Sequence, residues 1–178
     1  MTVTSVLKTK LGSNNNHNLD KIIPVIVQAL IGETCNQVSF SYGDELKLHF
    51  GEMSPYEHPK LAHLLKGSWR FGARATPWAV KHNDQILVVT AEADTDEQTA
   101  IAKEIVKQLE HKKLLDLTIE ADMLQLTFSF EDNYQLVLEP ELDDDSGLAY
   151  WELFMPTEQL LTVGPGFFWG CKSLHERY

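Results

Sequence analysis

The chain has 178 residues, of which 43% are hydrophobic and 10% aromatic, and its formal net charge at pH 7 is −11. This length suits one domain or two small domains packed together, and the apolar content is enough for a sizeable core and excludes wholesale disorder. The negative charge argues against binding to nucleic acid or to an anionic membrane, because both repel a negative surface.

The sequence has no recognisable targeting signal and no metal or redox spacing of its cysteines, and we therefore expect a cytoplasmic protein of bacterial type. No apolar run approaches the ~20 residues that a membrane helix needs. Residues 1–18 form a polar N-terminal segment without the apolar middle of a signal peptide. Cys35 and Cys171 stand far apart in no metal or redox spacing, which favours buried reduced thiols over one disulfide.

The first predicted elements are a helix and a strand pair. The helix begins near Leu19 or Asp20 and ends at Gly32, and its buried side is supplied by Ile22, Ile23, Ile26, Leu30 and Ile31. Alternating apolar residues then predict strands at 38–40 and 46–50, joined by a turn at 42–45.

The next segment is less regular. Pro59 with the leucines at 61, 64 and 65 predicts a short helix that ends at Gly67. Aromatic strands follow at 69–71 and 78–80. Residues 85–90 form the most apolar strand candidate of the first half, so we expect that strand to lie in the centre of a sheet.

The clearest helix spans about residues 95–112. Asp94 and Glu97 have the spacing of a capping box, and Ile101, Ile105 and Leu109 fall on one apolar stripe.

Residues 117–139 give the plainest strand signal in the chain. Apolar and polar side chains alternate at 117–119, 124–130 and 134–138, and residues 131–133 form the last turn. Two further strands are expected at 149–155 and 159–163, after an exposed polar loop at 140–147, and a tight turn at 164–166. The predicted class is therefore α+β with mainly antiparallel sheet.

The two halves of the chain, 19–92 and 93–178, share a design. Three strand residues of the first half match three of the second at an offset of 78, namely Leu46, Leu48 and Phe50 with Leu124, Leu126 and Phe128. Trp69 matches Trp151 at an offset of 82. We therefore predict a duplicated unit of helix, hairpin and two further strands, with the halves packed into one globular body.

Charge is segregated along the sequence. Residues 114–171 contain twelve carboxylates and no Lys or Arg, whereas residues 58–83 contain five cations and no acid. A field of one sign selects partners of the other, so the acidic region predicts a basic protein partner. The candidate binding residues are Asp143, Asp144 and Asp145 of the acidic loop, and Trp69, Arg70 and Arg74 of the basic segment. An ordinary solvated loop is the competing interpretation of the three aspartates.

The basic segment also has the composition of a single-strand nucleic-acid platform, through Trp69, Phe71 and Trp78. The total charge favours a different interpretation, in which these aromatic residues fill the core and the cations face the acidic half.

Metal-binding and catalytic motifs are weak. His49, Glu52, His58 and His63 lie within fifteen residues and could hold a metal ion such as zinc. However, His58 and His63 are misaligned on a helix, and alternation places His49 on the wet face of its strand, so surface or structural roles are favoured. No catalytic signature is present, so no catalytic residue and no cofactor are assigned.

One pattern resembles a known group. Trp151-Glu152-Leu153-Phe154-x-Pro156, followed by Leu160-Leu161-x-Val163-Gly164-Pro165-Gly166, is similar to small bacterial α+β domains of unknown function, some of which resemble immunity proteins of toxin systems. The likeness covers residues 114–169, with an echo in 30–51. It implies a cytoplasmic module without catalytic residues.

The sequence thus favours a non-enzymatic, acidic protein-binding module of immunity-like or regulatory type, without nucleic-acid or membrane partners. The alternative is a small-molecule or metal-binding protein, including an enzyme, with its site near His49, His58, His63 and Arg70.

Overall fold

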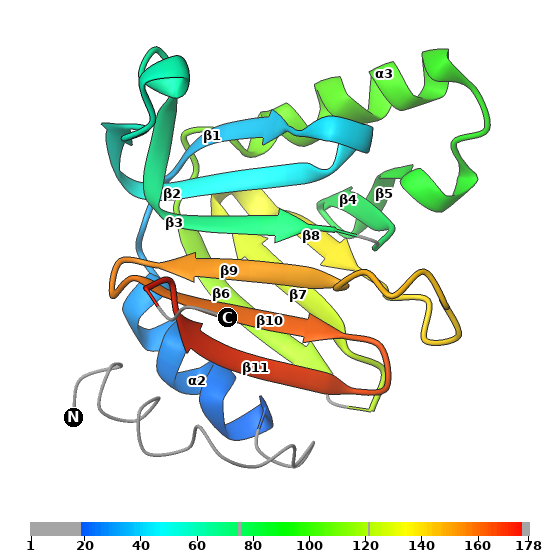
Figure 1. Cartoon of the computed structure of the whole chain (residues 1–178). Coiled ribbons are helices and arrows are strands. Elements are labelled where there is room, and N and C mark those ends of the chain that lie inside the picture. The colour runs from blue at the N-terminus through cyan, green and yellow to red at the C-terminus, as the bar shows by residue number, and fades with distance from the viewer. Residues whose placement is uncertain (1–18, 75, 121, 176–178) are drawn as a thin grey trace.

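The computed structural model describes residues 19–74, 76–120 and 122–175. In these ranges the chain forms two antiparallel sheets that face each other, with the helices α2 (Leu19–Leu30) and α3 (Asp96–Val106) beside them (Figure 1). The predicted α+β class with antiparallel sheets is confirmed. Neither of these helices is long and apolar enough to cross a membrane.

The six-stranded sheet has the order β1-β2-β3-β9-β10-β11 and the five-stranded sheet the order β5-β4-β8-β7-β6. The strands of the first sheet are β1 (Cys35–Phe40), β2 (Leu46–Pro55), β3 (Leu65–Ala73), β9 (Trp151–Met155), β10 (Gln159–Gly164) and β11 (Phe168–Ser173). Those of the second are β4 (Trp78–His82), β5 (Gln85–Val89), β6 (Leu114–Glu120), β7 (Gln125–Phe130) and β8 (Tyr134–Leu138).

Both halves of the chain contribute to both sheets. Strands β1–β3 lie in the six-stranded sheet, and the chain then crosses to the other sheet for β4 and β5. After α3 the same happens in reverse, because β6–β8 lie in the five-stranded sheet and β9–β11 in the other. The two crossovers meet at the Tyr150 carbonyl, which accepts hydrogen bonds from Arg74 N at 3.0 Å and Thr76 Oγ1 at 2.7 Å.

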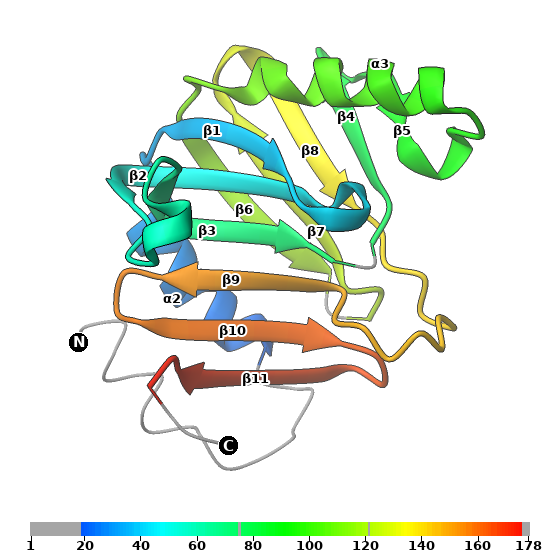
Figure 2. The same cartoon turned by 45° about the horizontal axis from the view of Figure 1, so that its top comes forward.

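Helix α2 covers one side of the core. It contacts β6 and lies behind β9–β11 in both views (Figures 1 and 2). Its buried residues are Leu19, Ile22, Ile23, Ile26, Val27 and Leu30. Ile31, predicted to be buried with them, lies beyond the end of the helix and is 43% exposed.

Helix α3 lies beside β1 and β5, and its predicted apolar stripe is confirmed in part, because Leu109 is buried and Ile105 packs against the core, whereas Ile101 does not. Its N-cap is Thr95, whose side chain accepts from Gln98 N, instead of Asp94 with Glu97. Ala102 and Val106 are buried, while Ile101 is 52% exposed. The reason is that residues 102 and 106 share the stripe that faces the sheets, whereas residue 101 points toward solvent.

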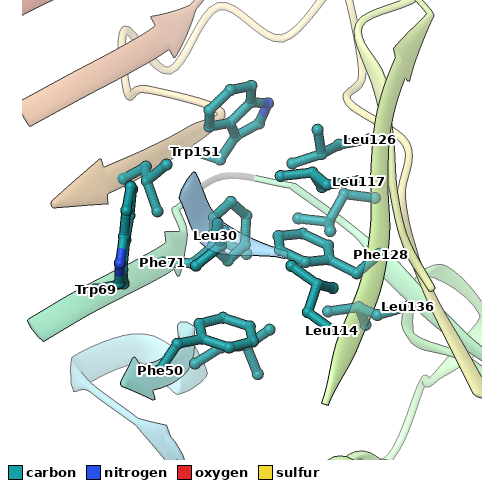
Figure 3. Close-up of a cluster of buried hydrophobic side chains, with 14 of the residues drawn as sticks. Leu30, Phe50, Trp69, Phe71, Leu114, Leu117, Leu126, Phe128, Leu136 and Trp151 are labelled. Carbon is teal, nitrogen blue, oxygen red and sulfur yellow. The ribbon is translucent and has the colours of Figure 1, made fainter. Parts of the chain in front are cut away.

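The core joins the inner faces of the two sheets (Figure 3). Phe50 of β2 stacks on Phe128 and Phe130 of β7, with ring centroids 6.4 and 6.2 Å apart. Phe71 of β3 meets Phe128 edge-on at 4.8 Å. These contacts bury large rings from both halves of the chain, and each such pair adds about 0.5–1.5 kcal/mol beyond the burial of its area.

Strand β5 is an edge strand, so its predicted central position is wrong. It pairs only with β4, across a two-residue turn in which Asn83 and Asp84 both have positive φ. The centre of the sheet is occupied by β8, β4 and β7, whose pairings with one another leave β5 outside. Ile86 is therefore 62% exposed despite its apolar side chain.

The segment after β2 also differs from its prediction. Only a 3-10 helix forms at Pro59–Leu61, and Gly67 lies inside β3 instead of ending a helix. A Cβ on Gly67 would stand 2.6 Å from the Phe50 carbonyl oxygen and 2.8 Å from the Phe50 nitrogen. The close approach of the two strands therefore requires glycine here. Strand β11 was not predicted beyond the turn at 164–166.

We expect Gly67→Ala to destabilise the protein by about 1–3 kcal/mol, because the new methyl group meets backbone atoms that cannot move freely. Gly72→Ala on the same strand is the matched control, since a Cβ there meets nothing within 4 Å. Its effect should stay within about 0.5 kcal/mol. Urea denaturation of both variants measures the difference, and equal effects would contradict the packing argument.

Candidate functional site

The candidate site is a groove of about 350 Å³ on the outer face of the five-stranded sheet, here called the outer groove. It lies at the end of the sheet where β8 leads into the loop 139–150. Ala79 of β4, Val89 of β5, Val137 of β8 and Met123 of the β6–β7 turn supply apolar lining. Glu139 and Glu141 lie at its edge, and no described lining residue is Lys, Arg or His.

The local sequence explains the apolar floor. Leu136 and Leu138 of β8 face the core, and Val137 between them faces outward, beside its strand partners Ala79 and Thr127. Val137 is nevertheless only 3% exposed. Because the alanine side chain next to it is short, the sheet surface is hollowed at this point.

The rim is held in place by the backbone. Glu139 N donates to the Pro77 carbonyl at 3.1 Å, which fixes the end of β8 beside the start of β4. Glu139 and Glu141 are both exposed, so their carboxylates face solvent at the edge of the groove.

The predicted acidic loop, residues 140–147, comes directly after Glu139 in the chain. Asp144 accepts hydrogen bonds from Ser146 Oγ at 2.7 Å and Ser146 N at 3.1 Å, and these bonds lower the pKa of its carboxyl group. Asp143 and Asp145 on either side are exposed. Tyr150 lies buried at the end of the loop, where burial, followed by the charges of Asp144 and Asp143, raises its pKa. The ordered turn thus presents carboxylates to solvent.

The other predicted binding residues lie elsewhere. Trp69 points into the core and is 6% exposed. Arg70 lies on the outer face of the six-stranded sheet, with its guanidinium 4.3 Å from the ring centroid of Phe154. Arg74 pairs with Glu45 at 3.1 Å and Glu152 at 3.4 Å. The structure therefore does not join these three residues and the aspartates into one site.

Arg74 lines a second, smaller cleft of about 210 Å³ between α3 and the β1–β2 turn. Lys103 of α3 pairs there with Asp44 and lies 5.1 Å from the ring centroid of Phe40. Both cations of this cleft already face carboxylates. Trp69, Phe71 and Trp78 are all buried, which confirms the favoured interpretation that these aromatic residues fill the core instead of forming a platform for base stacking.

His49 is buried, although alternation predicted it on the wet face. It does point to the outer face of β2, but it is only 2% exposed. Gly67 N donates to its Nδ1 at 3.2 Å, so Nδ1 carries no proton and Nε2–H donates to Ser39 Oγ at 3.1 Å. Burial, aided by the charges of Arg70 and Lys47, lowers the pKa of His49 to about 4.

The remaining metal candidates do not form a cluster. His58 is exposed and accepts a hydrogen bond from Lys60 N, and His63 is exposed. Within the described ranges no three His, Cys, Asp or Glu side chains are placed to hold one metal ion. Cys35 and Cys171 are both buried, and burial raises the pKa of Cys35 to about 12, which suppresses its reactive thiolate.

Comparison with known proteins gives no relative, since no family model, curated protein or solved structure matches the chain. The outer groove was not predicted from the sequence. Its one signal is the run Leu136-Val137-Leu138, which breaks the alternation of β8 with an apolar residue on the outward side.

We expect the stability of the protein to fall between pH 6.5 and pH 4 through His49. The unfolded chain binds its proton near pH 6.5 and the folded chain only near pH 4, so acid favours unfolding. The loss from pH 7 to pH 4 should be about 3 kcal/mol larger in the wild type than in His49→Gln. Urea titrations at both pH values measure it. His58→Gln, at an exposed position, should behave as the wild type, and equal losses in all three proteins would contradict the assignment.

Proposed function

We propose that this protein is a non-enzymatic binding module that receives a basic protein partner at the outer groove and the adjacent acidic loop. The observation that carries the proposal is the combination of an apolar floor with a rim of carboxylates and no described cation in the lining. Interfaces typically combine a desolvated apolar centre with a polar rim, and the outer groove offers both.

The electrostatics of this end of the sheet support a basic partner. Strands β6 and β8 both run antiparallel to β7, so they end on the same side of the sheet. Glu120 at the end of β6 and Glu139 after β8 therefore lie at the same end, together with the exposed aspartates of the loop. A field of one sign accelerates encounter with a partner of the other sign and excludes like-charged surfaces.

The lining also favours binding over catalysis. The titratable side chains that line the outer groove are Glu139 and Glu141, both exposed. Among the described residues of the lining there is no Ser, Cys, Lys or His, so these residues offer no nucleophile with an adjacent base. The resemblance of residues 114–169 to immunity-like bacterial domains suggests one specific form, in which the partner is a basic toxin neutralised in the cytoplasm.

We also propose that the two halves of the chain, residues 19–92 and 93–178, arose by duplication of one unit. When the two halves are matched in chain order, β1, β2 and β3 correspond to β6, β7 and β8, and β4 and β5 correspond to β9 and β10. Under this match β1-β2-β3-β9-β10 of one sheet and β6-β7-β8-β4-β5 of the other have the same order of corresponding strands. Trp151 of β9 then corresponds to Trp78 of β4, instead of Trp69.

We expect the triple substitution Asp143→Asn, Asp144→Asn and Asp145→Asn to reduce partner capture at least about ten-fold. The reason is the loss of three carboxylates from the surface that attracts the partner. The measurement is a pull-down from the native lysate on immobilised protein, at about 50 and 300 mM salt, where higher salt should also weaken capture.

The matched control removes the same charge from α3, through Asp96→Asn, Glu97→Gln and Glu104→Gln. These residues are exposed and lie away from the outer groove, so capture should persist. If no protein is captured, or if the two triple variants behave alike, the acidic loop is not the binding surface.

A further inference from the structure

The outer face of the six-stranded sheet carries a cluster of cations and aromatic rings, Tyr56, Lys66, Arg70 and Phe154, here called the cation–aromatic patch. Lys66 and Arg70 lie on β3 and belong to the basic segment 58–83, Phe154 lies on β9, and Tyr56 follows the end of β2. Arg70 and Phe154 are direct strand partners. This face lies in front of the five-stranded sheet in Figure 2, so the patch and the outer groove are on opposite sides of the molecule.

Arg70 is held between two rings, and its donors are unused. Its guanidinium lies 4.3 Å from the ring centroid of Phe154 and 5.8 Å from that of Tyr56. Within the ranges that the structure describes, this guanidinium makes no ion pair and no hydrogen bond. Arg74 on the same strand, by contrast, is paired with two carboxylates. Arg70 therefore presents five N–H donors in a fixed orientation.

Lys66 supplies a second cation beside Arg70. Its ammonium lies 5.5 Å from the ring centroid of Tyr56 and 3.9 Å from Glu57 Oε1. The side chain of Glu57 is 93% exposed, and exposed ion pairs contribute little to stability. A carboxylate of another molecule can therefore replace that of Glu57 at little cost.

The local field on this face is positive, although the chain as a whole is negative. His49 lies directly opposite Arg70 and is buried, and the charges that lower its pKa, after burial itself, are those of Arg70 and Lys47. Glu152 lies on the same face, but Arg74 pairs with its carboxylate at 3.4 Å. The region around Arg70 therefore attracts anions.

We propose that the cation–aromatic patch binds an acidic segment of a protein partner, with one carboxylate on Arg70 and a second beside Lys66. A planar guanidinium donates two parallel hydrogen bonds to one carboxylate. Because its ring contacts already fix the Arg70 side chain, binding costs little further side-chain entropy. Phe154 and its strand partner Leu160 offer an apolar surface next to the charges. Arg and Tyr are also among the residue types that most often dominate interface energies.

The geometry favours carboxylates over the bases of a nucleic acid. Arg70 covers ring faces of Phe154 and Tyr56, and Lys66 also lies over Tyr56, so these ring faces are not available for base stacking. A charge of −11 also opposes a long polyanion more than a short acidic segment. The N–H edges of the cations, which a carboxylate needs, remain accessible.

Fluorescence anisotropy with a labelled, end-blocked, Glu-rich peptide of about ten residues and a central Leu tests the proposal. We expect saturable binding with a dissociation constant on the order of 100 µM at about 50 mM salt, and much weaker binding at about 300 mM. Arg70→Gln should weaken binding at least about ten-fold, and Arg70→Lys by less, because Lys keeps the charge but loses the paired donors.

The matched control removes two cations elsewhere. Lys66→Gln with Arg70→Gln should abolish binding, whereas Lys21→Gln with Lys107→Gln should leave it unchanged, because these exposed lysines lie on α2 and after α3. The same peptide with Gln in place of Glu should not bind. Circular dichroism establishes that each variant is folded.

The inference does not rest on the proposed function, and one variant separates the two. With Asp143, Asp144 and Asp145 changed to Asn, the protein should bind the acidic peptide at least as tightly as the wild type, because no residue of the patch has changed. Loss of basic-partner capture in that variant bears only on the acidic loop.

Nuclear magnetic resonance locates the contact. Amides of residues 66–72 and of Phe154 should shift on addition of the peptide, whereas those of β7 should not. The proposal is overturned by the absence of saturable binding, by wild-type affinity in the variant with Lys66→Gln and Arg70→Gln, or by shifts confined to other strands. Tighter binding of an oligothymidylate of about ten nucleotides than of the peptide also overturns it, because the patch is then a nucleic-acid surface.

Discussion

The stacking of Phe50 on Phe128 is the contact on which the rest of this structure depends. It joins β2 of the first half to β7 of the second, and Phe71 and Phe130 extend it into a cluster that belongs to both sheets. Because the apolar faces of both sheets are used in this one core, each half completes the other. The outer faces and the connecting loops are what remain for binding.

The acidic loop owes its position to the path of the chain. After β8 the chain must leave the five-stranded sheet and enter the other one at β9, and the loop is this crossover. Its far end is fixed where the Tyr150 carbonyl receives Arg74 N and Thr76 Oγ1 from the other crossover. The carboxylates that we propose for binding are thus held beside the end of β8, where the outer groove lies.

The cleft beside α3 and the outer groove differ in charge, because the cleft contains cations that are paired with carboxylates. Arg74 is paired with Glu45 and Glu152, and Lys103 with Asp44, so several cations of the chain are matched inside its own fold. The outer groove receives no cation from its described lining residues. Part of the acidic excess of the sequence, from Glu139 to Asp145, therefore lies at one end of one sheet.

The sequence by itself determined the periodic parts of this protein. Alternation placed Phe128 and its neighbours on one face of β7, polar residues marked the turns, and the charge layout was plain. Only the tertiary structure decided which faces are covered and which strands have neighbours. His49 is buried because β3 crosses close beside it, and β5 is an edge because β4 pairs with β8, which follows much later in the chain. Periodicity records which residues share a face, but contacts between distant segments determine what lies against it.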